Sequence, residues 1–295
     1  MSARPAQRPA GGARPPVTLP GLAALKREGR PVVMVTAYDF PGARAAEEAG
    51  VDVVLVGDSA AMTVLGLDST TGVELEEMLV LARAVRRGLT TPLLVADLPF
   101  GSYEASDELA VTSAVRFVKE AGVDAVKLEG GGPVPLSRAR AVMAAGIPVM
   151  GHVGLTPQSA SALGGFRAQG RDLASATRVL GEAEALAAAG CFSVVLEAVP
   201  SQLTELLVPR LPGTVVIGIG AGPAVDGQVL VLHDLLGMRE GVGARFVQRY
   251  ADLQQAMVAG VRAYAEDVRE RRYPAPQHGY GMPAEVLAAL REQLG

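Results

Sequence analysis

Short apolar segments alternate with amphipathic stretches from Pro31 onward, and this alternation limits the folds open to the chain more than any other feature. Eight apolar segments can be counted, at residues 31–39, 51–59, 92–99, 124–131, 148–155, 193–200, 214–222 and 229–237. Most are separated by alanine-rich stretches of helical periodicity, many of which end at a glycine typical of a helix C-cap. A repeated strand and helix predicts a parallel sheet.

The number of strands favours one kind of parallel sheet. Eight nearly continuous apolar strands within roughly 250 residues predict an α/β fold, a closed (β/α)8 TIM-type barrel, over an open doubly wound sheet. Residues 244–273 follow the last strand and predict one or two further C-terminal helices that pack after the barrel. We therefore expect a single barrel domain over residues 17–280, including these helices, and a C-terminal extension over residues 281–295.

Residues 1–16 contain three arginines, no acidic residue and many Pro, Ala and Gly. Such a segment buries little apolar surface, so a disordered N-terminal tail is predicted.

Composition excludes several classes of function. With 295 residues, 49% of them hydrophobic, the chain can bury one large core. Its 27 Lys and Arg are scattered among 31 Asp and Glu, so no basic stripe for nucleic acid is expected. No apolar run approaches membrane-spanning length and no secretion signal is evident, which predicts a cytoplasmic protein with no membrane partner. The single cysteine, Cys191, is interpreted as a small buried side chain.

Polar residues lie at the ends of five consecutive predicted strands, the second to the sixth. They are Asp58 and Ser59, Asp97, Lys127 and Glu129, His152, and Glu197. In a (β/α)8 barrel the carboxyl ends of the strands form the rim that carries the active site. Alternation along the second strand places Asp58 on the same side as Val54 and Val56, and Asp97 likewise continues a buried row of the third strand. The pattern predicts one shared, polar mouth.

Structural interpretations compete with functional ones at these positions. A strand-end aspartate is often a cap, Lys127 and Glu129 can form a structural ion pair, and His152, like His233 and Asp234, can be a hydrogen-bonded filler. Convergence favours function, because three carboxylates beside a lysine on one rim would repel one another unless a cation lay among them. Oxygen ligands with hardly any histidine favour Mg²⁺ over zinc.

A glycine-rich segment, "GIGAG" at residues 218–222, is a weak signal. It lacks the G-x-G-x-x-G spacing and follows the seventh strand instead of the first. We interpret its glycines as allowing the backbone to approach a substrate closely.

Longer segments resemble the ketopantoate hydroxymethyltransferase family. They are "VTAYDFPGARAAEEAGVDVVLVGDSAAMTVLGLDST", "AVRRG", "LLVADLPFGSY", "VKLEGG", "GHVGLTPQS", "GGFRAQGR", "VLEAVP", "IGIGAG" and "DGQVLVLHDLLG". The similarity runs from about Val17 to about Tyr280. It implies a barrel of the phosphoenolpyruvate-mutase and isocitrate-lyase type, Mg²⁺ dependence, and a homo-oligomer, usually a decamer of two stacked rings. The implied reaction transfers a hydroxymethyl group from 5,10-methylenetetrahydrofolate to 3-methyl-2-oxobutanoate, giving 2-dehydropantoate for pantothenate synthesis.

The resemblance also implies roles for the polar residues. Asp58 and Asp97 would bind the metal, and Glu129 would lie at the metal through water. Ser59 and Lys127 would contact the keto acid. Asp58 and Asp97 would also bind the keto acid, through the metal. Lys127 would then balance the surplus negative charge.

Glu197 would be the base that removes the C3 proton, since it approaches from a different side of the mouth. The segment 67–72 departs from the family pattern, which puts the shape of that loop in doubt. No basic cluster for the folate tail stands out, and Arg167 and Arg171 are the only candidates considered.

Two other functions remain open from the sequence. A C–C lyase of the isocitrate-lyase kind would share the metal and keto-acid logic, but a catalytic cysteine loop would be expected, and Cys191 is misplaced for it. A catalytically silent barrel would not need a base, so the presence of Glu197 argues against it.

Overall fold

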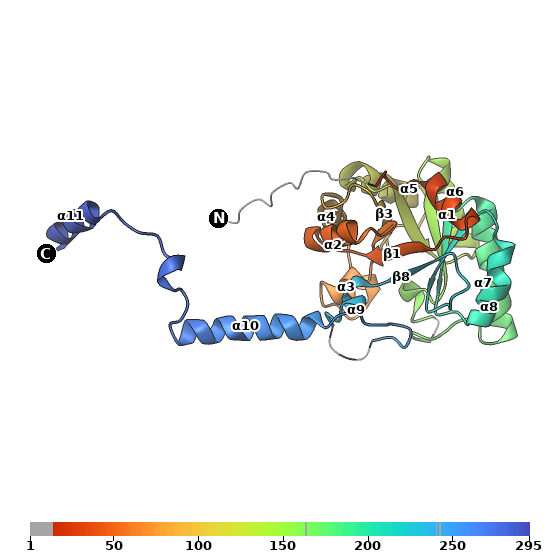
Figure 1. Cartoon of the computed structure of the whole chain (residues 1–295). Coiled ribbons are helices and arrows are strands. Elements are labelled where there is room, and N and C mark those ends of the chain that lie inside the picture. The colour runs from red at the N-terminus through yellow and green to blue at the C-terminus, as the bar shows by residue number, and fades with distance from the viewer. Residues whose placement is uncertain (1–13, 163, 240, 242) are drawn as a thin grey trace.

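A closed barrel of eight parallel strands forms the body of the computed structural model, which describes residues 14–162, 164–239, 241 and 243–295 (Figure 1). Each strand pairs with the next and the last pairs with the first, so the predicted α/β barrel is confirmed. The strands are β1 Val32–Thr36, β2 Val53–Val56, β3 Leu93–Asp97, β4 Ala125–Glu129, β5 Val149–Gly154, β6 Ser193–Glu197, β7 Val215–Ile219 and β8 Gly227–Leu230.

Helices surround the barrel and continue beyond it (Figure 1). The α-helices are α1 Leu19–Arg27, α2 Phe40–Ala49, α3 Ala60–Thr63, α4 Leu75–Arg86, α5 Asp107–Arg116, α6 Pro133–Ala144, α7 Leu173–Ala189, α8 Ser201–Leu207, α9 Leu232–Leu235, α10 Leu253–Arg269 and α11 Ala284–Leu294. Shorter turns are η1 Thr70–Gly72, the π-type turn η2 Phe117–Ala121, η3 Pro157–Ser159, η4 Val208–Arg210 and η5 Pro276–His278. Local signals set the bounds: at α2, Asp39 accepts a hydrogen bond from Gly42 N at 2.7 Å, and Gly50 ends the helix with φ 74°.

Two apolar cores explain why the strands are apolar on both faces. Inside the barrel, side chains such as Leu55 and Val95 pack together, and Leu22 of α1 joins them at 1% exposure. Outside, the alternate side chains such as Val54 pack beneath the helices. The segment forming α1 was not singled out in the sequence, yet its Lys26 reaches Asp226 at 2.8 Å and ties the helix to the barrel.

The prediction that Asp58 continues the side of the strand formed by Val54 and Val56 is wrong. Val54 and Val56 face the helices, while Leu55 faces the barrel interior. Asp58 lies two residues beyond the end of β2, in a turn where strand alternation no longer applies, and it is buried all the same. The row that contains Asp97 does face the interior, as predicted.

The eighth strand begins and ends earlier than predicted. It covers Gly227–Leu230, and most of the remaining predicted segment forms α9. Glycine is required at the start, since a Cβ at Gly227 would lie 2.4 Å from Val32 O. The chain leaves the sheet where Leu232 N donates to Thr36 Oγ1 at 2.9 Å. His233 therefore lies on a helix.

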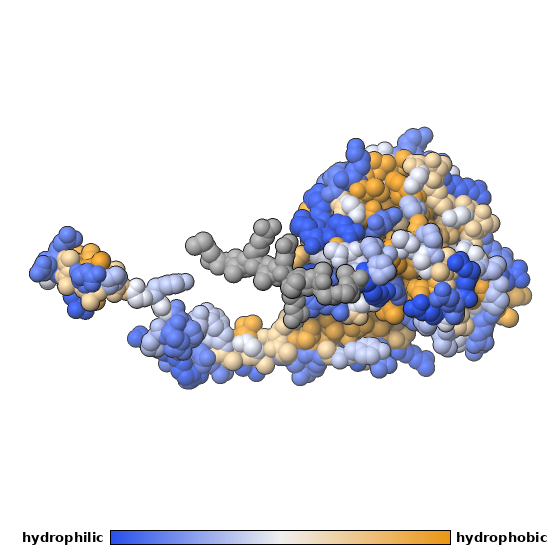
Figure 2. Space-filling view, turned by 45° about the horizontal axis from the view of Figure 1, so that its top comes forward, coloured by the Kyte–Doolittle hydropathy of each residue, from blue (hydrophilic) through white to orange (hydrophobic). Residues whose placement is uncertain are grey.

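C-terminal helices follow the barrel, as predicted, and α10 lies within residues 244–273. Helices α10 and α11 project away from it, and neither contains a buried residue (Figure 1). Figure 2 shows hydrophobic residues on the barrel surface and along α10, beside hydrophilic ones. The amphipathic pattern of α10 and α11 indicates one apolar face on each helix.

The proposed domain bounds stay a prediction. Residues 1–13 of the predicted tail lie outside the described residues, whereas Arg14 pairs with Asp52 at 2.5 Å. In the described part of the chain, no helix has the length and apolar character needed to cross a bilayer.

Candidate active site

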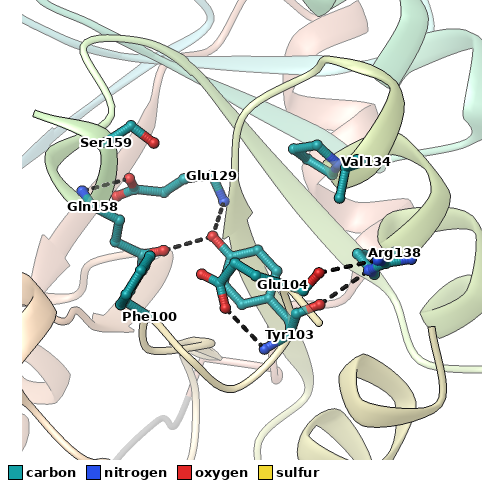
Figure 3. A pocket seen from close by; sticks show the side chains of 9 residues that line it. Phe100, Tyr103, Glu104, Glu129, Val134, Arg138, Gln158 and Ser159 are labelled. Atoms are coloured by element: carbon teal, nitrogen blue, oxygen red, sulfur yellow. Dashed lines mark hydrogen bonds between the residues drawn. The ribbon is translucent and has the colours of Figure 1, made fainter. Parts of the chain in front are cut away.

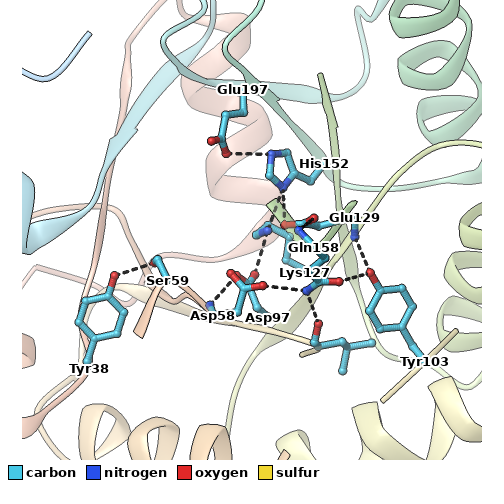
Figure 4. Close-up of polar contacts among 11 residues, drawn as sticks. Tyr38, Asp58, Ser59, Asp97, Tyr103, Lys127, Glu129, His152, Gln158 and Glu197 are labelled. Carbon is cyan, nitrogen blue, oxygen red and sulfur yellow. Dashed lines mark hydrogen bonds and ion pairs between the residues drawn. The ribbon is translucent and has the colours of Figure 1, made fainter. Parts of the chain in front are cut away.

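A cavity of about 100 Å³ opens at the carboxyl ends of the strands and brings the predicted polar residues together (Figure 4). Its polar lining consists of Thr36, Asp58, Ser59, Thr70, Asp97, Lys127, Glu129, His152 and Glu197. Its apolar lining consists of Leu55, Pro157, Val195, Ile219, Val229 and Val231. The volume corresponds to a few water molecules or one small organic acid. The seven polar residues expected at the ends of the second to sixth strands thus share one small cavity.

The three carboxylates are each held at one oxygen by an N–H donor. Gln158 Nε2 donates to Asp58 Oδ2 at 2.8 Å, and Gln158 N donates to Glu129 Oε2 at 2.9 Å. Asp58 N in turn donates to Asp97 Oδ2 at 3.0 Å. Neutral donors therefore fix the orientation of all three acids.

The second oxygens of Asp97 and Glu129 face charged or ionisable groups. Lys127 Nζ lies 3.1 Å from Asp97 Oδ1, and His152 Nδ1 lies 3.5 Å from Glu129 Oε1. Within the described residues neither oxygen has a well-formed hydrogen bond. Lys127 Nζ also lies 3.1 Å from His152 Nδ1, so one ammonium group connects two strands of the site.

Burial and charge shift the protonation of these groups. Burial, followed by the charges of Asp97 and Glu129, raises the pKa of Asp58 well above its usual value. Burial also raises the pKa of Asp97, although Lys127 opposes the shift. Burial would raise the pKa of Glu129, but its contacts with His152 and Lys127 outweigh burial and lower it. For Lys127, the neighbouring carboxylates outweigh burial and raise its pKa. Two of the three acids thus resist ionisation unless further positive charge is present.

His152 belongs to the polar network. Its Nε2 lies 3.2 Å from Glu197 Oε2, so the imidazole stands between Glu197 and Lys127. Burial and Lys127 lower the pKa of His152, but Glu129 and Glu197 outweigh them and raise it to about 9. Glu197 is the last residue of β6, and its side chain keeps 17% exposure. It is the most accessible acid of this network.

Several uncharged residues were missed by the sequence analysis, including Thr36 and Thr70 of the cavity lining. Tyr38 OH lies 2.8 Å from Ser59 Oγ, and burial raises the pKa of this tyrosine to about 12. Gln158 lies in η3, directly after β5, and Tyr103 OH donates to its Oε1 at 2.5 Å. Gln158 follows the end of a predicted strand, and this position was the signal that could have identified it. A search limited to charged side chains does not find a glutamine.

A second pocket shares Glu129 with the first and is also bordered by Gln158 (Figure 3). Phe100 and Val134 contribute apolar surface to it. Arg138 also borders it, but the guanidinium is engaged with Tyr103 O at 3.0 Å and with other oxygens. This pocket therefore has no free cation to offer an anionic ligand within the described residues.

Other sequence signals are structural or lie apart. Cys191 is buried, and burial raises the pKa of its thiol to about 12. Gly220 and Gly222 have φ of 66° and 80°, and a Cβ at either would lie 2.5 Å from a neighbouring side chain, so the glycines serve the close packing of the chain. Arg167 and Arg171 are exposed, and neither lines the cavity.

The donor set fits Mg²⁺ better than a metal that needs an all-protein cage. Among the residues that the structure describes, no three His, Cys, Asp or Glu side chains already form such a cage. Mg²⁺ does not require one, because it is usually held by one or two carboxylates together with water and substrate oxygens. Asp58 and Asp97, two buried carboxyl groups oriented by hydrogen bonds, could supply the protein oxygens of such a site.

Fold and site together define a (β/α)8-barrel enzyme whose buried acids and lysine lie at the carboxyl ends of the strands. Solved structures of similar fold include a phosphonopyruvate hydrolase, with TM-score 0.59 and 14% identity over 94% of this chain and 96% of that chain. Another is 2,3-dimethylmalate lyase, a PEP mutase/isocitrate lyase superfamily member, with TM-score 0.56 and 16% identity over 94% of this chain and 99% of that chain.

The family model of ketopantoate hydroxymethyltransferase matches residues 16–276. The 3-methyl-2-oxobutanoate hydroxymethyltransferase of Carboxydothermus hydrogenoformans is 50% identical over 93% of this chain and 99% of its own length. That of Deinococcus radiodurans is 52% identical over 90% of this chain and 93% of its own length. The chain belongs to the ketopantoate hydroxymethyltransferase family and is an enzyme of the transferase class. This membership favours the transferase over the lyase and the silent barrel.

The buried charge balance predicts the effect of removing the lysine. Lys127→Met leaves several acids without their cation, so the free energy of unfolding without Mg²⁺ should fall by about 3–5 kcal/mol. Adding Asp97→Asn should restore part of the loss. Urea unfolding in EDTA measures both, with Lys119→Met as the exposed control. A double variant as unstable as Lys127→Met alone would contradict the charge explanation.

Proposed function

We propose that this chain transfers a hydroxymethyl group from 5,10-methylenetetrahydrofolate to 3-methyl-2-oxobutanoate and forms 2-dehydropantoate. The carrying observation is the meeting of two carboxylates, a lysine and, on another strand, Glu197 in one small cavity. The names of the relatives at about 50% identity support the same substrate.

Asp58 and Asp97 would hold Mg²⁺, with Glu129 nearby through water. When bound, Mg²⁺ would supply a Lewis acid for the keto oxygen and carboxylate of the substrate. Lys127 would balance the negative charge that the keto acid and its C3-deprotonated form bring into the cavity. Ser59 would donate a hydrogen bond to the substrate.

Apolar side chains of the cavity suit the branched end of the keto acid. Leu55, Val195 and Ile219 line the cavity and belong to, or pack against, the core inside the barrel. They offer a dry surface for two methyl groups, while the acids and Lys127 receive the oxygens. The substrate would thereby be bound in one orientation.

Glu197 would remove the proton from C3 of the keto acid, and His152 would hold its carboxylate through the contact at 3.2 Å. Water would cleave both C–N bonds of the methylene group, releasing tetrahydrofolate and leaving the carbon as formaldehyde. The deprotonated C3 would then add to the formaldehyde carbon, and its oxygen would take up a proton to become the hydroxyl group. Keto-acid activation can therefore be tested without the folate.

Removal of either proposed metal ligand should weaken substrate binding. Asp58→Asn or Asp97→Asn replaces an anionic ligand by a neutral amide, which should cost several kcal/mol of binding. Calorimetry of 3-methyl-2-oxobutanoate with and without Mg²⁺ measures the loss, and Glu48→Gln on the exposed face of α2 is the control. Unchanged Mg²⁺-dependent binding in both variants would disprove the metal assignment.

The base is separable from the metal ligands. Glu197→Gln keeps the shape of the side chain but cannot accept a proton, so exchange of the C3 hydrogen in D₂O should drop at least about a hundredfold. Binding of the keto acid with Mg²⁺ should change far less. NMR follows the exchange, and the exposed Glu205→Gln is the control. Exchange at the wild-type rate would remove Glu197 from the role of base.

We also propose that the chain assembles with copies of itself. Met257, Val258, Val261, Tyr264 and Val268 recur on α10 at helical spacing and are exposed in the single chain. Family resemblance supports a second copy as the partner of this face.

Val261→Glu introduces a charge into the apolar face of α10 and should shift the protein toward smaller species in sedimentation velocity. Gln255→Glu, at an exposed position on another side of the helix, should leave the distribution unchanged. A monomeric wild type would contradict self-assembly, and a Val261→Glu variant that sediments like the wild type would exclude this face.

A further inference from the structure

Every polar atom of the Gln158 side chain has a hydrogen-bond partner, and Gln158 donates hydrogen bonds to two of the acids. Its Oε1 accepts from Tyr103 OH at 2.5 Å, and its Nε2 donates to Asp58 Oδ2 at 2.8 Å and to Leu98 O at 3.1 Å. Its backbone N donates to Glu129 Oε2 at 2.9 Å. The amide group has one acceptor oxygen and two N–H hydrogens, so this set is complete.

Tyr103 fixes which end of the amide faces the cavity. Glu129 N donates to Tyr103 OH at 3.4 Å, so the single hydroxyl hydrogen is free to go to Gln158 Oε1. An amide turned over would set its oxygen against a carboxylate and its N–H₂ against a hydroxyl that already accepts a hydrogen bond. The buried tyrosine therefore selects the orientation in which Gln158 donates to Asp58 (Figure 4).

This arrangement sorts the carboxylate oxygens into two sets. Gln158 occupies Oδ2 of Asp58 and Oε2 of Glu129, which leaves Oδ1 and Oε1 for other partners. No protein donor to Asp58 Oδ1 is found in the described part of the chain, and this residue lines the cavity. An acid held in this way keeps its rotamer and still presents one oxygen to a cation.

We propose that Gln158, locked by Tyr103, is a positioning residue for the cation site. From the turn that follows β5, it bridges the acids that follow β2 and end β4, and so joins parts of the barrel that are distant in the sequence. The affinity for the divalent cation then depends on an amide that does not touch the cation. The proposal rests on the proposed function in that Asp58 is taken as a metal ligand.

Gln158→Met tests the proposal, because methionine has nearly the same length but no side-chain donor, and the backbone N–H to Glu129 remains. Mn²⁺ is the probe, since its binding is read by EPR without keto acid or folate. Loss of a hydrogen bond that orients a metal ligand typically costs 10–100-fold in metal affinity, and that weakening is expected here. Gln202→Met, on an exposed position of α8, should bind Mn²⁺ like the wild type.

Tyr103→Phe tests the lock separately and disturbs packing little. It should weaken Mn²⁺ binding less than Gln158→Met, because the amide keeps its donor but loses its fixed orientation. The double variant should be no weaker than Gln158→Met alone, since both act through one hydrogen bond. Full additivity of the two effects would overturn the lock.

The outcomes distinguish this proposal from the proposed function. A folded Gln158→Met with wild-type Mn²⁺ affinity, even with a lowered melting temperature, would show a merely structural role and overturn the inference. If wild type does not bind Mn²⁺ and Asp58→Asn behaves alike, the proposed metal site itself fails. Wild-type binding that falls in both Asp58→Asn and Gln158→Met supports both.

Discussion

One buried ammonium group among three buried carboxylates is the interaction on which the site depends. Lys127 contacts Asp97 directly and opposes the rise in the pKa of Asp58. Even with His152 protonated, two positive charges face four carboxylates once Glu197 is included. Burial and mutual repulsion keep the pKa values of Asp58 and Asp97 high. A cation that shared these oxygens would offset this repulsion, as the proposed metal site requires.

Strand register assembles this cluster. Asp97 pairs with Lys127 across β3 and β4, and Glu129 pairs with His152 across β4 and β5. Because these residues all face the barrel interior, residues that are paired in register also place their ionisable groups next to each other. A shift of one residue in either pairing would turn a whole row toward the helices, so the two apolar cores that fix the register also fix the ion pairs.

The sequence predicted what depends on periodicity and missed what depends on tertiary contact. Apolar runs located the eight strands, and strand ends located Asp97 and Glu197, because both signals are local. Strand alternation did not predict the orientation of Asp58, because this residue lies in a turn. The hydrogen bond between Gln158 and Asp58 joins residues 100 positions apart, so no local pattern indicates it. The apolar pattern of α10 likewise gave a helix but not its distance from the barrel. The proposed roles at the metal and the substrate follow from family resemblance.

The division of the cavity into a polar and an apolar half explains why the proposed base belongs on β6. Acids and Lys127 come from the strands on one side, where Leu55 of β2 also adds apolar surface, whereas Ile219 and Val229 come from β7 and β8. Glu197 pairs in register with Ile219, so it stands at the border between the two halves. In 3-methyl-2-oxobutanoate, C3 is the atom that joins the oxygen-bearing end to the methyl groups. A molecule bound with its oxygens at the acids and its methyl groups on the apolar wall would therefore bring C3 to the border, where Glu197 can reach the proton.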